Sequence, residues 1–164
     1  MKKYYFTLAS AVLLTSAAHA QGTELFFSEY DEGAHQSGIT YNGAASASTG
    51  NERAIEIYNP TTSVVNLAPY SVRRYSNGSR TVVEEERLIR RNSTANTINS
   101  RATFVLANGE ATLPNILSAA NQLSAGYQTA GPSVILLGGV TYFNGDDAMA
   151  LVRYPSGTAG VGPG

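Results

Sequence analysis

Short apolar segments separated by strong turn signals constrain the fold of this chain more than any other feature of its sequence. Within residues 54–58, Ile55 and Ile57 point to one face and polar side chains to the other, as in a half-buried strand. Asn-Gly pairs tolerate the positive φ angles of tight hairpin turns, and they occur at 77–78, 108–109 and 144–145. Many short strands with turns between them are typical of a β-sandwich or a barrel.

The remaining segments complete this all-β pattern. Residues 34–52 are rich in Gly, Ser, Ala and Asn, and they predict an exposed loop. Residues 113–123 interrupt the strands, and Pro114 near their start predicts one or two helical turns. Strands are expected at 25–30, 54–58, 64–67, 70–75, 81–89, 104–107, 134–137 and 148–152.

The first twenty residues have the layout of a secretory signal peptide. A positive head at Lys2 and Lys3 precedes a mostly apolar run over 6–18, and Ala-His-Ala at 18–20 supplies small residues for cleavage. The alternative is an uncleaved membrane anchor, for which the apolar run is short. We therefore expect a secreted or cell-surface protein that is cleaved after Ala20 and has no later membrane span.

Composition limits the chemistry of the mature chain. The chain has no cysteine, which excludes disulfides, thiolate metal sites and thiol catalysis. Both lysines lie in the predicted signal peptide, so the basic residues of the mature chain are arginines. Acidic residues slightly outnumber these arginines. Such a balance does not indicate a surface that strongly attracts nucleic acid or membranes.

The predicted mature chain divides into one domain and a tail. Residues 21–154 carry the strand pattern, whereas residues 155–164 are rich in Gly and Pro and carry none. We expect a single β-domain followed by a flexible tail that is a truncation point of a longer chain.

Five motifs occur in order along the chain: Phe27-Ser-Glu-Tyr30 with Glu32-Gly33, Ala54-Ile-Glu-Ile-Tyr-Asn59, Leu67 with Tyr70-Ser-Val72, Tyr75-Ser-Asn-Gly78 and Asn144-Gly-Asp-Asp-Ala148. In their order and spacing they resemble the lamin-tail domain of secreted bacterial proteins. The resemblance implies an immunoglobulin-like β-sandwich with one short helical segment, used as a non-catalytic binding module. It also implies an alternative, in which the domain is the N-terminal accessory part of a secreted nuclease or phosphoesterase whose catalytic domain lies outside this chain.

Four acids in these motifs are candidate calcium ligands: Glu29, Glu56, Asp146 and Asp147. Calcium is bound by six to eight oxygens from carboxylates and carbonyls. The alternative is structural, because Asp side chains often accept hydrogen bonds from the backbone N–H groups of a turn. Apart from this possible calcium ion, no cofactor is expected.

Four arginines are candidate binding residues: Arg73, Arg74, Arg90 and Arg91. Guanidinium groups bind phosphates through two parallel hydrogen bonds, and nearby tyrosines could stack on bases. The acidic run at 84–86 favours the alternative, in which cross-strand Arg–Glu pairs neutralise the patch. The ligand could accordingly be a protein, a polysaccharide or a nucleic acid.

Catalysis has little support in the sequence. After removal of the signal peptide the remaining histidine is His35, in the predicted loop, and no carboxylate or serine is fixed beside it by a recognisable motif. No Gly-rich phosphate loop, histidine pair or nucleophile elbow occurs. We therefore do not expect this chain to be an enzyme.

Overall fold

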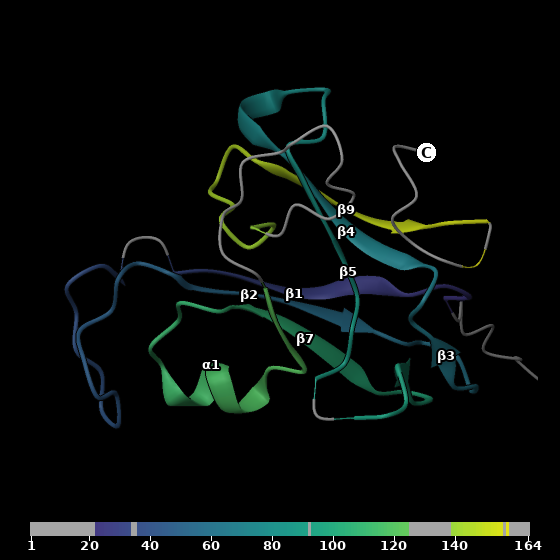
Figure 1. Ribbon diagram of the computed structural model, residues 1–164, viewed down its shortest axis with the longest axis horizontal. Helices are drawn as coiled ribbons and strands as arrows, with labels where there is room; N and C mark the ends of the chain where they lie inside the picture. The colour runs from purple at the N-terminus through teal and green to yellow at the C-terminus, as the bar shows by residue number, and fades with distance from the viewer. Residues whose placement is uncertain (1–21, 34–35, 92, 125–138, 156, 158–164) are drawn as a thin grey trace, which may run out of the picture.

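The computed structural model describes residues 22–33, 36–91, 93–124, 139–155 and 157 (Figure 1). The predicted signal peptide, His35, the predicted strand at 134–137 and most of the predicted tail lie outside these residues. In the described part of the chain, no helix is long and apolar enough to span a membrane.

Two sheets form the framework. The first sheet has the strand order β1-β2-β7-β8, and the second has the order β5-β4-β9. Neighbouring strands are antiparallel except β7 and β8, which are parallel. The first sheet consists of β1 (Phe26–Gly33), β2 (Glu52–Tyr58), β7 (Thr103–Asn108) and β8 (Gln122–Ser124); the second consists of β4 (Tyr70–Tyr75), β5 (Glu84–Arg87) and β9 (Ala148–Arg153).

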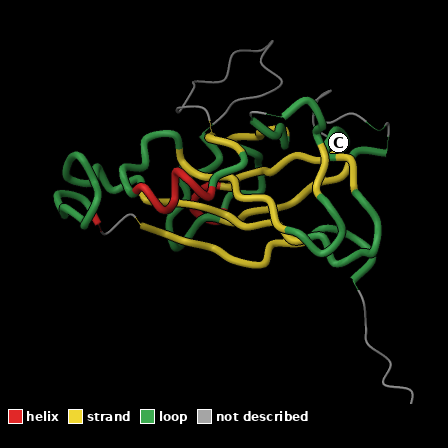
Figure 2. The backbone as a smooth tube through the Cα atoms, turned by 90° about the horizontal axis from the view of Figure 1, so that it is seen from below, coloured by secondary structure: helices red, strands yellow, loops and turns green. Residues whose placement is uncertain are grey.

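Two smaller elements complete the fold. Strands β3 (Val65–Asn66) and β6 (Thr97–Ile98) form a separate antiparallel pair. The short helix α1 (Pro114–Ala119) lies beside β7 and away from β4 and β9 (Figure 1). Most strands run along the long dimension of the molecule (Figure 2).

The core contains side chains from both sheets, which makes the arrangement a sandwich. Alternate residues of the first sheet point inward and are buried, among them Ile55 of β2 and Phe104 of β7. Val72 of β4 enters the same cluster from the second sheet, and Phe143 joins it from the segment before β9. The predicted β-sandwich with one short helix is confirmed.

The Asn77-Gly78 pair has the positive φ angles that its sequence predicts, but it lies in the longer connection 76–83 between β4 and β5 rather than in a tight hairpin. The Asn-Gly pairs at 108–109 and 144–145 do not have positive φ angles. Asn77 has φ 51° and Gly78 has φ 69°, both in the left-handed region. The two residues belong to the short turn η2 (Ser76–Gly78), in which Asn77 is not in a helical conformation, and the Asn77 N–H donates to the Asp147 carboxylate at 2.9 Å. The turn is therefore held from the start of β9 as well as by its own conformation.

Glu52 differs most from its predicted environment. It was expected at the end of an exposed loop, but it begins β2 and is 1% exposed. Its carboxylate accepts hydrogen bonds from the Thr112 hydroxyl and from the N–H groups of Thr112 and Leu113, just before α1. Burial raises the pKa of Glu52, but these hydrogen bonds lower it more, so the group stays ionised. Glu52 thus links β2 to the entry of α1.

Candidate functional site

A groove crosses the outer face of the first sheet beside α1. Its volume is about 250 Å³. We call it the acidic groove, because carboxylates line one side and apolar side chains line the other. Its main lining residues are Glu29, Asp31 and Glu56 on the acidic side and Val105, Ile116 and Ala119 on the apolar side.

Strand pairing brings the three acids together. Glu29 lies directly opposite Glu56 in the antiparallel ladder of β1 and β2, and directly opposed residues point to the same face of a sheet. Asp31 shares that face because it is two residues beyond Glu29. The register shifts between Phe27 and Glu29, and Ser28 at this irregularity donates its hydroxyl hydrogen to Glu56 Oε1 at 2.7 Å.

The groove carries negative charge that no cation of the described residues neutralises. Within the described residues, none of the three carboxylates forms an ion pair. Partial burial, with a further contribution from the negative charge of Glu52, raises the pKa of Asp31 above its ordinary value. A ligand with a positive charge beside an apolar group would match both sides of the groove.

The four predicted calcium ligands are divided between two places. Glu29 and Glu56 lie in the acidic groove, whereas Asp146 and Asp147 lie in the turn before β9. Asp146 is exposed. The described residues contain no group of three or more His, Cys, Asp or Glu side chains arranged to hold a metal ion. The structure therefore does not bring the four acids into one site.

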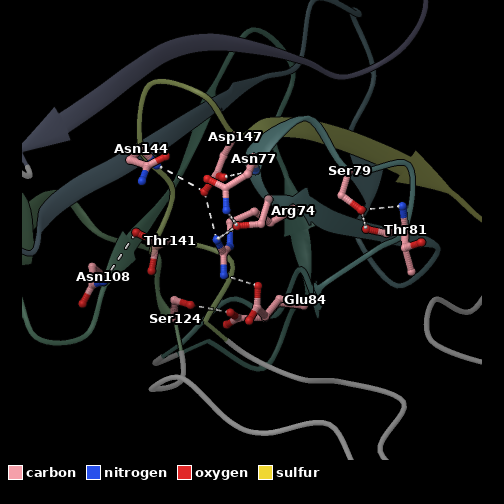
Figure 3. A network of polar contacts seen from close by, with 12 residues as sticks. Arg74, Asn77, Ser79, Thr81, Glu84, Asn108, Ser124, Thr141, Asn144 and Asp147 are labelled. Atoms are coloured by element: carbon pink, nitrogen blue, oxygen red, sulfur yellow. Dashed lines mark hydrogen bonds and ion pairs between the residues drawn. The ribbon is translucent and has the colours of Figure 1, made fainter.

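Asp147 occupies the structural role that was the alternative to calcium binding (Figure 3). It accepts hydrogen bonds from the Asn77 N–H and from Arg74 Nη1, both at 2.9 Å. Burial raises the pKa of Asp147, but hydrogen bonds from Asn77, Arg74 and Ser76 lower it by more than burial raises it. The folded pKa of Asp147 therefore lies below its ordinary value. The carboxylate is thus used to join the β4–β5 turn to β9.

Arg73 and Arg74 are buried in the second sheet, where they pair with acids of β5. Arg73 lies opposite Glu85 and Arg74 opposite Glu84 in the ladder, and each forms an ion pair with its cross-strand partner. Their exposed fractions are 7% and 6%. The predicted cross-strand Arg–Glu pairs are present, and neither guanidinium group is available to a ligand.

Arg91 and Arg90 also have partners within the protein. Arg91 donates to the carbonyl oxygens of Ala120 and Leu117, and these hydrogen bonds cap the C-terminal end of α1. Arg90 donates from Nε to the Thr97 carbonyl oxygen at 3.0 Å. The four predicted binding arginines therefore do not form one basic face.

Part of the groove was not apparent from the sequence. Asp31 could have been found, because it follows Glu29 at the two-residue period of a strand. Val105 and Ile116 carry no such signal, since they reach the groove only when β7 pairs with β2 and α1 packs beside β7.

Comparison with known proteins identifies one family. A family model described as Lamin Tail Domain matches residues 18–160. No curated protein and no solved structure gives a significant match.

Proposed function

The chain belongs to the lamin-tail domain family, and from this premise we propose that it is the binding module of an exported bacterial protein and that its acidic groove holds a basic segment of a partner protein. Domains of this family are immunoglobulin-like interaction modules without catalytic activity. Family membership gives the class of function, and the groove supports the kind of partner.

The observation that carries the proposal is the pairing of uncompensated charge with an apolar wall. Glu29, Asp31 and Glu56 can each attract an arginine or lysine side chain. Val105 and Ile116 offer a surface for the aliphatic parts of the same segment. Nucleic acid is disfavoured on this face, because its phosphates would meet carboxylates.

Neutralising two groove acids is expected to weaken the binding of a cationic peptide. A fluorescent peptide of arginine and leucine residues serves as the probe, and fluorescence anisotropy measures its dissociation constant. The double variant Glu29→Gln/Glu56→Gln should bind about three- to tenfold more weakly, since each exposed ion pair contributes modestly. Binding by the unaltered protein should weaken as salt is added, because ions screen exposed charges.

Two controls separate groove binding from general charge attraction. Asp146→Asn removes an exposed acid outside the groove, and it should leave the affinity unchanged. A peptide with glutamate in place of arginine should not bind. The proposal is wrong if the double variant retains full affinity or if the acidic peptide binds equally well.

Export and a longer parent protein are proposed on separate grounds. The layout of residues 1–20 supports export with cleavage after Ala20. The alternative function, an accessory domain of a secreted nuclease or phosphoesterase, is supported by residues 155–164, whose Gly- and Pro-rich composition is typical of linkers.

The intact mass of the native protein in the secreted fraction of its source cells tests both points. Export of a free-standing module predicts a species slightly lighter than the 17.3 kDa of this chain. The accessory-domain alternative predicts a much heavier secreted species that contains these residues. An uncleaved chain that stays with the cells would contradict export.

A further inference from the structure

A second cavity lies between the segment after β5 and the start of β7, and it differs in character from the acidic groove. Its volume is about 410 Å³, within the range of small-molecule sites. As far as the described residues go, it shares no lining residue with the groove, and none of its lining residues is acidic. Its main lining residues are Arg90, Ser93, Thr97, Asn99 and Thr103.

Arg90 is held in a fixed position at this cavity. Its Nε–H donates to the Thr97 carbonyl oxygen at 3.0 Å, and its backbone N–H donates to Asn96 Oδ1 at 2.9 Å. Its guanidinium carbon lies 5.4 Å from the ring centroid of Phe104, which is fully buried. The side chain therefore has little conformational freedom left to lose when it binds a ligand.

The outer end of this guanidinium group has no protein partner in the described part of the chain. No carboxylate forms an ion pair with Arg90, and no described residue accepts a hydrogen bond from Nη1 or Nη2. In this respect Arg90 differs from Arg73 and Arg74, which are neutralised by acids. Arg90 is a fixed positive charge with two nitrogen atoms free to donate.

The rest of the lining supplies neutral hydrogen-bonding groups. The side chains of Thr97, Asn99 and Thr103 form no hydrogen bond with other described residues. Hydroxyl and amide groups can both donate and accept, which suits ligands rich in hydroxyl groups. The cavity thus combines one anion-binding group with several groups that can bind sugar hydroxyls.

We propose that this cavity binds a uronic acid unit of an acidic polysaccharide. The planar carboxylate would accept two parallel hydrogen bonds from Nη1 and Nη2 of Arg90, a geometry that guanidinium and carboxylate groups match well. The ring hydroxyls would exchange hydrogen bonds with Thr97, Asn99 and Thr103. One fixed cation balances the single charge of one uronate.

A nucleic acid fits this cavity less well. Nucleic-acid binding depends on several cations that each neutralise a phosphate. Among the described residues that line the cavity, Arg90 is the one basic residue. A neutral polysaccharide would leave the guanidinium group without the partner for which it is positioned.

Calorimetric titration with short uronate oligosaccharides tests the proposal. The panel contains galacturonate, glucuronate and mannuronate oligomers, with the methyl ester of the galacturonate oligomer as an uncharged analogue. At least one free-acid oligomer should bind the unaltered protein. Arg90→Gln should weaken that binding about ten- to a hundredfold, because it removes charge-assisted hydrogen bonds.

A second variant guards against misfolding of the first. Thr103→Glu places a negative charge, the same sign as that of the uronate, at the exposed wall of the cavity and leaves Arg90 against Phe104. Repulsion between the two carboxylates should abolish most of the binding. The matched controls Arg80→Gln and Thr81→Glu alter exposed residues outside the cavity and should bind normally.

Results of three kinds would overturn the proposal. The first is that no oligomer in the panel binds the unaltered protein. The second is that the methyl ester binds as well as the free acid, or that Thr103→Glu retains full affinity. The third is that a short single-stranded DNA binds in an Arg90-dependent way while the uronates do not, which would assign the cavity to phosphate. None of these outcomes depends on whether the acidic groove binds a basic peptide.

Discussion

Replacing Arg74 with methionine is expected to lower the free energy of unfolding by about 3–5 kcal/mol at neutral pH. Arg74 lies between Glu84 and Asp147 and forms an ion pair with each (Figure 3). Both carboxylate side chains are 1% exposed. Methionine fills much of the space but leaves two buried negative charges without their cation, and this desolvated charge produces the loss.

Urea denaturation, monitored by circular dichroism, measures the effect. Arg80→Met is the control, because Arg80 is exposed, and it should change the free energy of unfolding by less than about 0.5 kcal/mol. The loss in Arg74→Met should become smaller at acidic pH, because protonation of Glu84 and Asp147 removes the unpaired charge. Burial already raises the pKa of Glu84 despite the presence of Arg74. A loss below about 1 kcal/mol would contradict this prediction, because it would show that water or rearranged side chains stabilise the two carboxylates in place of Arg74.

The second large effect is expected at Gly33, where alanine should cost about 3 kcal/mol. A Cβ atom at this position would lie 2.1 Å from the carbonyl oxygen of Glu52 and 2.5 Å from its Cβ. These neighbours belong to the backbone and base of the paired strand, so they cannot rotate away. Relief requires β1 and β2 to separate at this point, which also displaces the Glu52 carboxylate from Thr112.

Thermal and urea unfolding of Gly33→Ala measure this cost. Gly145→Ala is the matched control, since its added Cβ would meet only the Glu32 carboxylate at 3.6 Å, an ordinary contact. The control should stay within about 0.5 kcal/mol of the unaltered protein. Equal stability of the two alanine variants would show that the β1–β2 pair tolerates the added methyl group.

Local sequence signals predicted the parts of the fold that depend on local chemistry. The strand at Tyr70–Tyr75 was predicted with its observed bounds, and the Asn77-Gly78 turn has the predicted positive φ angles. The helix was expected because of Pro114, and it begins there. Turn residues and strand periodicity act over a few residues, so they can be read from one stretch of chain.

Elements that depend on distant partners were missed. Strands β6 and β8 are two and three residues long, and they exist because β3 and β7 are positioned to pair with them. The burial of Glu52 depends on Thr112, sixty residues away. No alternation or motif reveals such a partner before the sheets are assembled.

The candidate binding residues show the same division. Glu29 and Glu56 were singled out with Asp147, yet the sheets place the first two on an outer face and the third inside a turn. Among the arginines, Arg90 lies beyond the β4–β5 ladder and forms no ion pair with a described residue, whereas Arg74 has an acid in its cross-strand position. Charge type could be read from the sequence, but charge compensation depends on which strands pair.

Strand β1 stands at one end of the first sheet, and no described strand pairs with its outer edge. An open edge of this kind invites other copies to add on and begin a fibrillar aggregate. The negative charges of Glu29 and Asp31, together with the irregular backbone at Ser28, oppose such stacking, because a second copy would bring like charges together. The acids that we propose for partner recognition therefore have a second effect, because their charge lies on the strand at which another copy would otherwise add.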